Sequence, residues 1–131
     1  MASDAVLADS CVFISLLREG RDVFRWWRER FGDLFTCGMI RVEVVRGIRS
    51  PAIRRDIERL LDTACNVPAD GRVWQSAADL GWELARSGLM IPAADLVIAA
   101  CALRAKVPVL TADRHFARVP GLRVEWFDPA V

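Results

Sequence analysis

The sequence has little of what membrane-spanning or exported proteins use. No apolar run reaches the roughly 20 residues that a helix needs to cross a bilayer, although 53% of the residues are hydrophobic. The N-terminus lacks a basic segment followed by an apolar core and a small-residue cleavage site. We therefore expect a cytoplasmic protein that neither enters a membrane nor is secreted. A length of 131 residues favours one domain over 1–131.

Histidine and paired cysteines are also scarce. His115 is the only histidine, and the four cysteines are widely spaced with no Cys-x-x-Cys pair, which argues against a zinc site. Each cysteine has apolar neighbours. We therefore predict that all four are small, reduced core residues: Cys11, Cys37, Cys65 and Cys101.

Lysine is nearly absent, since Lys106 is the only one beside seventeen arginines. The net charge is only +1, so no overall positive field indicates a nucleic-acid ligand. Arginine suits bidentate phosphate contacts, but the codon bias of a GC-rich genome explains the excess equally well. Charge composition therefore does not separate the function classes.

Apolar strands and amphipathic helices alternate along the chain without a linker, repeat or low-complexity segment. We predict strands over 4–9, 34–36, 65–67, 107–111 and 123–127. We predict helices over 10–19, 21–31, 40–48, 51–63, 70–84 and 92–105, and a short helical turn over 113–117. This alternation indicates an α/β fold with a parallel β-sheet sandwiched between α-helices. In such sheets, ligands bind beyond the carboxyl ends of the strands.

Four acidic residues stand out by their positions. Asp9 ends the first predicted strand and Asp113 follows the fourth, whereas Glu43 and Asp95 lie in strongly apolar segments. Each has an ordinary explanation on its own. Asp9 and Asp113 can cap helices, Asp95 suits the dipole of a first turn, and Glu43 can pair with a nearby arginine.

Taken together, the four acids indicate a metal site. Two carboxylates about 4 Å apart repel by about 4 kcal/mol at an effective dielectric constant near 20. Clustered acids therefore share a proton or hold a hard cation. Oxygen ligands without histidine or cysteine favour Mg²⁺ or Mn²⁺ over zinc. The sequence does not by itself establish that the four side chains converge.

Four segments in this order repeat the spacing of one known family. They are Asp9-Ser10 after a strand, Thr36 through Val42-Glu43-Val44-Val45-Arg46-Gly47, Pro92-Ala93-Ala94-Asp95-Leu96-Val97-Ile98-Ala99-Ala100, and Thr111-Ala112-Asp113-Arg114-His115-Phe116. The chain resembles PIN-domain ribonucleases, and most closely the VapC-type toxins of bacterial toxin–antitoxin pairs. The resemblance covers nearly the whole chain and implies a single three-layer α/β/α domain.

The resemblance also implies which residues form the site. Asp9, Asp95 and Asp113 match the metal-binding aspartates, and Glu43 matches the glutamate that completes the same catalytic pocket. Two hydroxyl residues match positions that hold these carboxylates or contact the substrate phosphate: Ser10 and Thr111. The chain departs from the family at Cys11, where many members carry serine or asparagine, so a polar contact near Asp9 is open to question.

The implied activity is hydrolysis of RNA phosphodiester bonds by an endoribonuclease that uses Mg²⁺ or Mn²⁺. Glu43 would take or orient a metal-bound water as the nucleophile. The implied partners are an RNA substrate, a cognate antitoxin protein and a second copy in a homodimer. The sequence shows no base-recognition motif, so it does not indicate whether the target is transfer, messenger or ribosomal RNA.

Two other function classes are alternatives to a nuclease. A catalytically silent interaction module of the same fold is the main alternative, although the presence of all four acids favours an enzyme. A receiver-like signalling domain needs adjacent acids after its first strand and a lysine ending a late strand. Asp9 has no acidic neighbour and Lys106 precedes its strand, and Cys11 occupies the second position that an Asp-x-Asp phosphatase would need.

The remaining candidates are assigned no chemistry. We predict that His115 is structural or a peripheral substrate contact. The aromatic cluster of Phe24, Trp26, Trp27 and Phe31 could stack bases, but its helical spacing favours core packing or a groove for a partner helix. One of the two adjacent tryptophans is expected at an interface, which the resemblance suggests an antitoxin covers. Three further tryptophans are interpreted as core or interface anchors: Trp74, Trp82 and Trp126.

Overall fold

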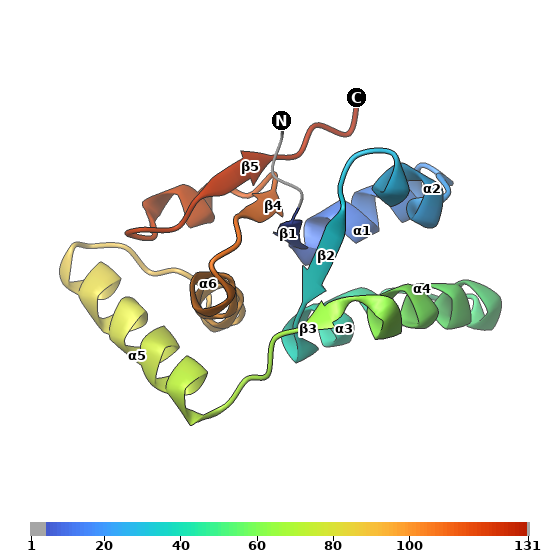
Figure 1. Ribbon diagram of the computed structural model, residues 1–131. Helices are drawn as coiled ribbons and strands as arrows, with labels where there is room; N and C mark the ends of the chain where they lie inside the picture. Colours follow the sequence, from blue (N-terminus) through green and yellow to red (C-terminus); the bar gives the residue numbers. More distant parts are fainter. Residues whose placement is uncertain (1–4, 131) are drawn as a thin grey trace.

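The computed structural model describes residues 5–130, which form one five-stranded parallel sheet in the order β3-β2-β1-β4-β5 (Figure 1). The central strand β1 (Ala5–Ala8) pairs with β2 (Asp33–Thr36) on one side and with β4 (Val109–Thr111) on the other. The edges are β3 (Cys65–Asn66) and β5 (Val124–Trp126). The first predicted strand began at Asp4, which lies outside the described residues.

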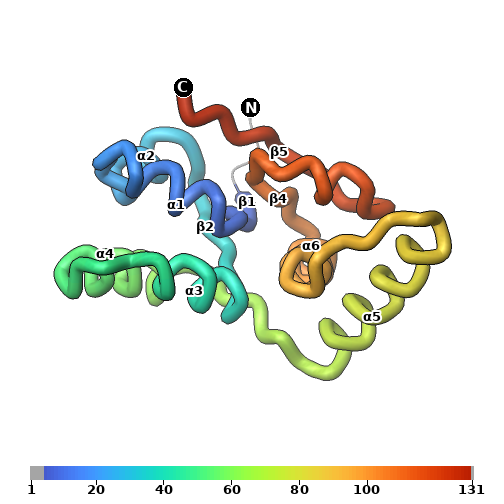
Figure 2. The backbone as a smooth tube through the Cα atoms, turned by 180° about the vertical axis from the view of Figure 1, so that it is seen from behind, coloured from blue at the N-terminus to red at the C-terminus, as the bar shows by residue number. Residues whose placement is uncertain are grey.

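Helices connect the parallel strands and cover both faces of the sheet. The bounds are α1 (Ser10–Arg18), α2 (Val23–Arg28), α3 (Gly38–Val45), α4 (Pro51–Thr63), α5 (Gly71–Arg86), α6 (Ala93–Ala105) and the 3₁₀ helix η1 (Arg114–Arg118). Figures 1 and 2 show α1 to α4 on one side of the sheet and α5 with α6 on the other. The predicted sandwich is therefore confirmed.

Polar residues placed before the helices start them, as the sequence indicated. Asp9 caps α1, Ser50 caps α4, Asp70 caps α5 and Asp113 caps η1, each by accepting a backbone N–H with its side chain. The caps at Asp9 and Asp113 place both carboxylates directly after a strand, at the carboxyl edge of the sheet.

The most apolar helix, α6, lies inside the molecule between the sheet and α5 (Figure 1). Every residue from Val97 to Ala102 is buried. Gly81 lets α5 approach closely, because a Cβ at this position would lie 2.8 Å from Leu96 Cδ1. This packing holds the first turn of α6, and with it Asp95, against the sheet. Among residues 5–130, no helix has both the length and the apolar character that crossing a bilayer requires.

The core packing predicted for the two adjacent tryptophans is confirmed. Trp26 and Trp27 are both buried, at 6% and 5% exposed, because Trp26 packs edge-on against Phe127 while Trp27 packs at a tilt against Phe31. Neither tryptophan therefore lies at an open interface of this chain, so the prediction that one of them does is wrong. Cys65 is exposed on the edge strand β3, so it is not a core cysteine. Three tryptophans predicted as core or interface anchors are exposed, which excludes the core for each and leaves the interface role as a prediction: Trp74, Trp82 and Trp126.

Candidate functional site

Asp9 follows the central strand, and its carboxylate is held from two sides. The residue is only 4% exposed. Its Oδ1 accepts a hydrogen bond from Ser10 N at 2.8 Å, and its Oδ2 accepts one from Thr111 Oγ1 at 2.8 Å. Burial raises the pKa of Asp9 against the opposing effect of these bonds, and the charge of Asp113 raises it further. The hydrogen bonds thus hold the Asp9 carboxylate in a fixed orientation, and the negative charge of Asp113 acts on it.

Thr111, at the end of β4, links this aspartate to the next strand end. Its side chain is fully buried, and its Oγ1 also accepts a hydrogen bond from Asp113 N at 2.9 Å. Cys11 Sγ lies 3.6 Å from the same oxygen. Because the hydroxyl proton of Thr111 goes to Asp9, the Cys11 thiol acts as the donor here. Burial raises the pKa of Cys11 to about 11, which keeps the thiol protonated.

This contact bears on the departure from the family at Cys11. A thiol is a weaker donor than a hydroxyl, yet it reaches the hydroxyl that positions Asp9. A polar contact near Asp9 is therefore present, and a hydrogen bond from the Cys11 thiol also lowers the pKa of Asp9 directly, against the larger effect of burial.

Asp95, Asp113 and His115 form a cluster beside Asp9. One ligand atom from each of the three lies within 4.8 Å of the others, so the group can hold a metal ion. His115 Nδ1 is 3.3 Å from Asp95 Oδ2 and 3.3 Å from Asp113 Oδ1. Burial raises the pKa of Asp95, as do the charges of Asp9 and Asp113, while the hydrogen bond from His115 opposes them. Three acids therefore act on one another at the carboxyl ends of β1 and β4.

Glu43 lies on α3 and is not one of the three residues of this cluster. It lines a groove of about 500 Å³ between α1 and the α3–α4 segment, together with Ser10. Its Oε1 is buried and has no hydrogen-bond partner within residues 5–130. A buried carboxylate oxygen without a partner is energetically costly, so it is suited to bind a ligand or a water molecule.

The structure thus brings together three of the predicted acids, Asp9, Asp95 and Asp113, and Glu43 is not a member of this group. Sequence reasoning did not place His115 with the acids. The spacing Asp113-x-His115 was the available signal, because Asp113 Oδ1 caps η1 by accepting His115 N at 2.9 Å. This turn brings the imidazole back toward the carboxylate.

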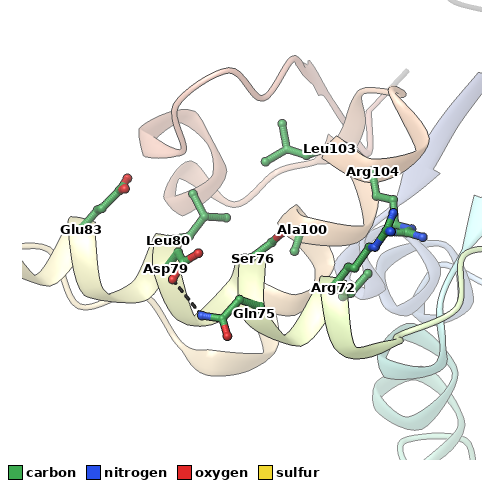
Figure 3. Close-up of a pocket in the computed structure, with 10 residues that line it drawn as sticks. Arg72, Gln75, Ser76, Asp79, Leu80, Glu83, Ala100, Leu103 and Arg104 are labelled. Carbon is green, nitrogen blue, oxygen red and sulfur yellow. Dashed lines mark hydrogen bonds between the residues drawn. The ribbon is translucent and has the colours of Figure 1, made fainter.

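A separate groove of about 680 Å³ lies between α5 and α6 (Figure 3). Two of its polar groups are paired with each other, since Gln75 Nε2 donates to Asp79 Oδ1 at 3.0 Å (Figure 3). Arg104 forms an ion pair at 3.1 Å with Asp70, which lies outside the groove. None of the predicted site residues lines this groove. We assign it no chemistry.

The family model of the PIN domain matches residues 6–122. The chain belongs to the PIN domain family. This confirms the family resemblance indicated by the four sequence segments. No curated protein sequence matches the chain significantly.

Solved structures similar to this PIN domain come from toxin–antitoxin systems. VapBC2 from Rickettsia felis, bound to a promoter DNA fragment, has a TM-score of 0.76 at 16% identity, with 95% of this chain and 99% of that chain covered. VapBC-5 from Mycobacterium tuberculosis has a TM-score of 0.64 at 27% identity, covering 95% and 98%. VapC20 from the same organism, a sarcin–ricin loop cleaving toxin, has a TM-score of 0.62 at 15% identity, covering 90% and 98%. The fold of this chain is the one these proteins share.

Proposed function

We propose that this PIN domain is a metal-dependent endoribonuclease, acting as one domain over 1–131 and as the toxin of a toxin–antitoxin pair. The observation that carries the proposal is the cluster of Asp95, Asp113 and His115, linked to Asp9 through Thr111 at the carboxyl ends of β1 and β4. Family membership and the similarity to a toxin that cleaves the sarcin–ricin loop support it.

The donor set fits Mg²⁺ or Mn²⁺. The carboxylates of Asp9, Asp95 and Asp113 would hold the ion, because hard divalent cations prefer oxygen ligands. The raised pKa values of Asp9 and Asp95 reflect burial and mutual repulsion that a cation would relieve. A bound divalent ion supplies Lewis-acid stabilisation of the negative charge that develops on the phosphate.

The other residues position groups and move a proton. Glu43 accepts the proton of the attacking water, for which its buried and unpaired Oε1 is suited. Ser10 lines the same groove as Glu43 and contacts the substrate phosphate. Thr111 holds Asp9, and His115 Nδ1 keeps Asp95 and Asp113 in a fixed orientation.

The partner we propose is a cognate antitoxin, since the similar structures from Rickettsia felis and Mycobacterium tuberculosis are VapBC structures. The groove beside Glu43 is the surface it would cover. Its apolar lining includes Ile14, Leu17 and Ile53, and Arg46 also lines it. An antitoxin bound there would block Glu43 directly. A homodimer remains a prediction of the family resemblance.

The test is cleavage of purified total RNA by the wild-type protein with Mn²⁺ or Mg²⁺, compared with the same reaction in EDTA. We expect cleavage with metal, none in EDTA, and none by Asp95→Asn with Mn²⁺. Equal cleavage in EDTA would show that the metal mechanism is wrong. No cleavage under any condition, together with tight binding of a small partner protein, would favour a silent interaction module.

A further inference from the structure

A second surface lies one strand away from the acids, at the same carboxyl end of the parallel strands. In the register of β4 and β5, Thr111 pairs with Trp126, and Phe127 N donates to Thr111 O at 2.9 Å. Trp126 therefore lies next to the residue whose hydroxyl holds Asp9. The site and this tryptophan share one rigid piece of sheet.

Trp126 borders a cleft of about 690 Å³ with two arginines of η1, Arg114 and Arg118. Ala112 and Arg114 line this cleft, and they are the two chain neighbours of Asp113. The cleft thus begins at the residues that flank Asp113 and extends along η1 to β5. A chain whose phosphate sits at the acids would run into it.

The cleft carries positive charge that the described residues do not neutralise. Arg114 and Arg118 are exposed, and neither forms an ion pair within residues 5–130, whereas Arg41, Arg54 and Arg104 all pair with acids. Arginine binds phosphate through bidentate, charge-assisted hydrogen bonds. A second, smaller cleft that Trp126 also borders is lined by two acids, Glu125 and Asp128, and by one cation, Arg30, which is ion-paired with Glu29 at 3.6 Å, so its lining is net negative. The charge difference directs an anionic chain to the η1 side.

The ring of Trp126 is available for stacking. It is 55% exposed, and no aromatic ring or guanidinium within the described residues stacks on it. Trp82 on α5 provides the contrast. It is 63% exposed, but the Arg86 guanidinium lies 5.1 Å from its ring centroid and occupies one face.

We propose that this cleft binds the nucleotide next to the scissile phosphate of an unpaired RNA segment. Its base stacks on Trp126, and its flanking phosphates contact Arg114 and Arg118. Base–aromatic stacking contributes about 1–3 kcal/mol per base and needs a base free of its helical neighbours. Stacking at Trp126 therefore requires an unpaired base at this position. This inference rests on the proposed nuclease function and adds the residues that bind the neighbouring nucleotide.

The experiment measures binding of a short fluorescein-labelled single-stranded RNA of mixed sequence, and of the same strand annealed to its complement, by anisotropy. All proteins carry Asp95→Asn, so that the RNA stays intact. Trp126→Ala and Arg118→Gln are compared with the matched controls Trp82→Ala and Arg86→Gln, which alter an exposed tryptophan–arginine pair on α5.

We expect Trp126→Ala to weaken single-strand binding about tenfold, a value inside the range for one stacked base. Arg118→Gln should weaken it several-fold and lower the salt dependence by roughly 0.7 in the slope of log K against log salt, the value for one phosphate contact. The two control variants should bind like the parent protein, and the duplex should bind more weakly than the single strand.

Equal binding by the Trp126→Ala and Trp82→Ala variants would overturn the inference, as would equal affinity for duplex and single strand or no RNA binding at all. Cleavage assays separate this from the proposed function. In the active background, Trp126→Ala should raise KM with little change in kcat. Wild-type cleavage that Trp126→Ala leaves unchanged in KM would reject the subsite and retain the nuclease.

Discussion

Asp9 and Glu43 are two acidic residues in apolar segments, and their carboxylates differ in hydrogen bonding. Both oxygens of Asp9 accept hydrogen bonds, one from the adjacent Ser10 and one from Thr111, 102 residues away. Glu43 Oε1 is buried with no partner in the part of the chain that the structure describes. One carboxylate is fixed by the fold, and the other is left for a ligand.

This difference matches the two roles that we propose. A metal ligand works best when its orientation is set in advance by outer contacts such as the Thr111 hydroxyl. A proton acceptor must present a lone pair that no protein donor occupies. The following predictions test this difference between the two carboxylates, in order of decreasing expected effect.

Removing a charge from the cluster should abolish activity. Asp95→Asn should lower cleavage by about a thousandfold or more, since loss of the ion removes several kcal/mol of stabilisation. Mn²⁺ at a hundred times its Kd should stabilise the wild type by about 2.7 kcal/mol and the variant by much less. Differential scanning fluorimetry with and without Mn²⁺ checks this. Asp79→Asn on α5 is the control, and an equal loss of Mn²⁺ stabilisation there would contradict a local site.

Neutralising the unpaired carboxylate should affect catalysis without unfolding the protein. Glu43→Gln should lower kcat by about a hundredfold, at the low end of the range for a general base. Mn²⁺ stabilisation should persist, because Glu43 lies outside the cluster. Single-turnover cleavage and thermal unfolding are the measurements, with Glu83→Gln on α5 as the control. Unchanged kcat would remove Glu43 from the mechanism.

Removing the hydroxyl that orients Asp9 should have an intermediate effect. Thr111→Val deletes the donor to Asp9 Oδ2 and the acceptor for Asp113 N. We expect a loss of about 1–3 kcal/mol in the free energy of unfolding and at least a tenfold loss of activity or metal affinity. Thr111→Ser retains the hydroxyl and should recover most of both. If valine and serine behave alike, the hydrogen bonds of Thr111 have no role.

The smallest effect concerns pH in the metal-free protein. Burial raises the folded-state pKa of Asp95 above its unfolded value. Its contribution to stability is therefore complete below the unfolded pKa, about 4, and is lost as pH rises through the folded pKa. In EDTA, Asp95→Asn should melt a few degrees above the wild type at pH 7, with a smaller difference at pH 4. A larger difference at pH 4 would contradict this sign.

Much of the fold follows from local signals. The strand and helix ranges were predictable because apolar periodicity, the caps at Ser50 and Asp70, and the stop at Gly20 act over a few residues. The sequence identifies the acidic residues as candidates for a metal site. It leaves helix capping and metal binding as alternative roles for Asp9 and Asp113. Asp113 caps η1 and also lies in the cluster, and Asp9 caps α1 beside the cluster, where the charge of Asp113 acts on it.

The contacts that complete the site were not predictable. His115 joins the acids because a 3₁₀ turn brings its ring back between two elements. The burial of Trp26 depends in part on Phe127, which comes about a hundred residues later in the chain. No pattern of neighbouring residues predicts contacts between side chains that are so far apart in the sequence.

By itself, the sequence determined the order of strands and helices, the set of acidic residues and the family, because these depend on residue type and spacing. Only the tertiary structure decided that Thr111 holds Asp9, that Glu43 keeps an unpaired oxygen, and that Trp126 lies beside the site while Trp82 does not. The physical reason is strand pairing. The register of β1, β4 and β5 brings residues more than a hundred positions apart to one edge, and short-range signals do not encode that register.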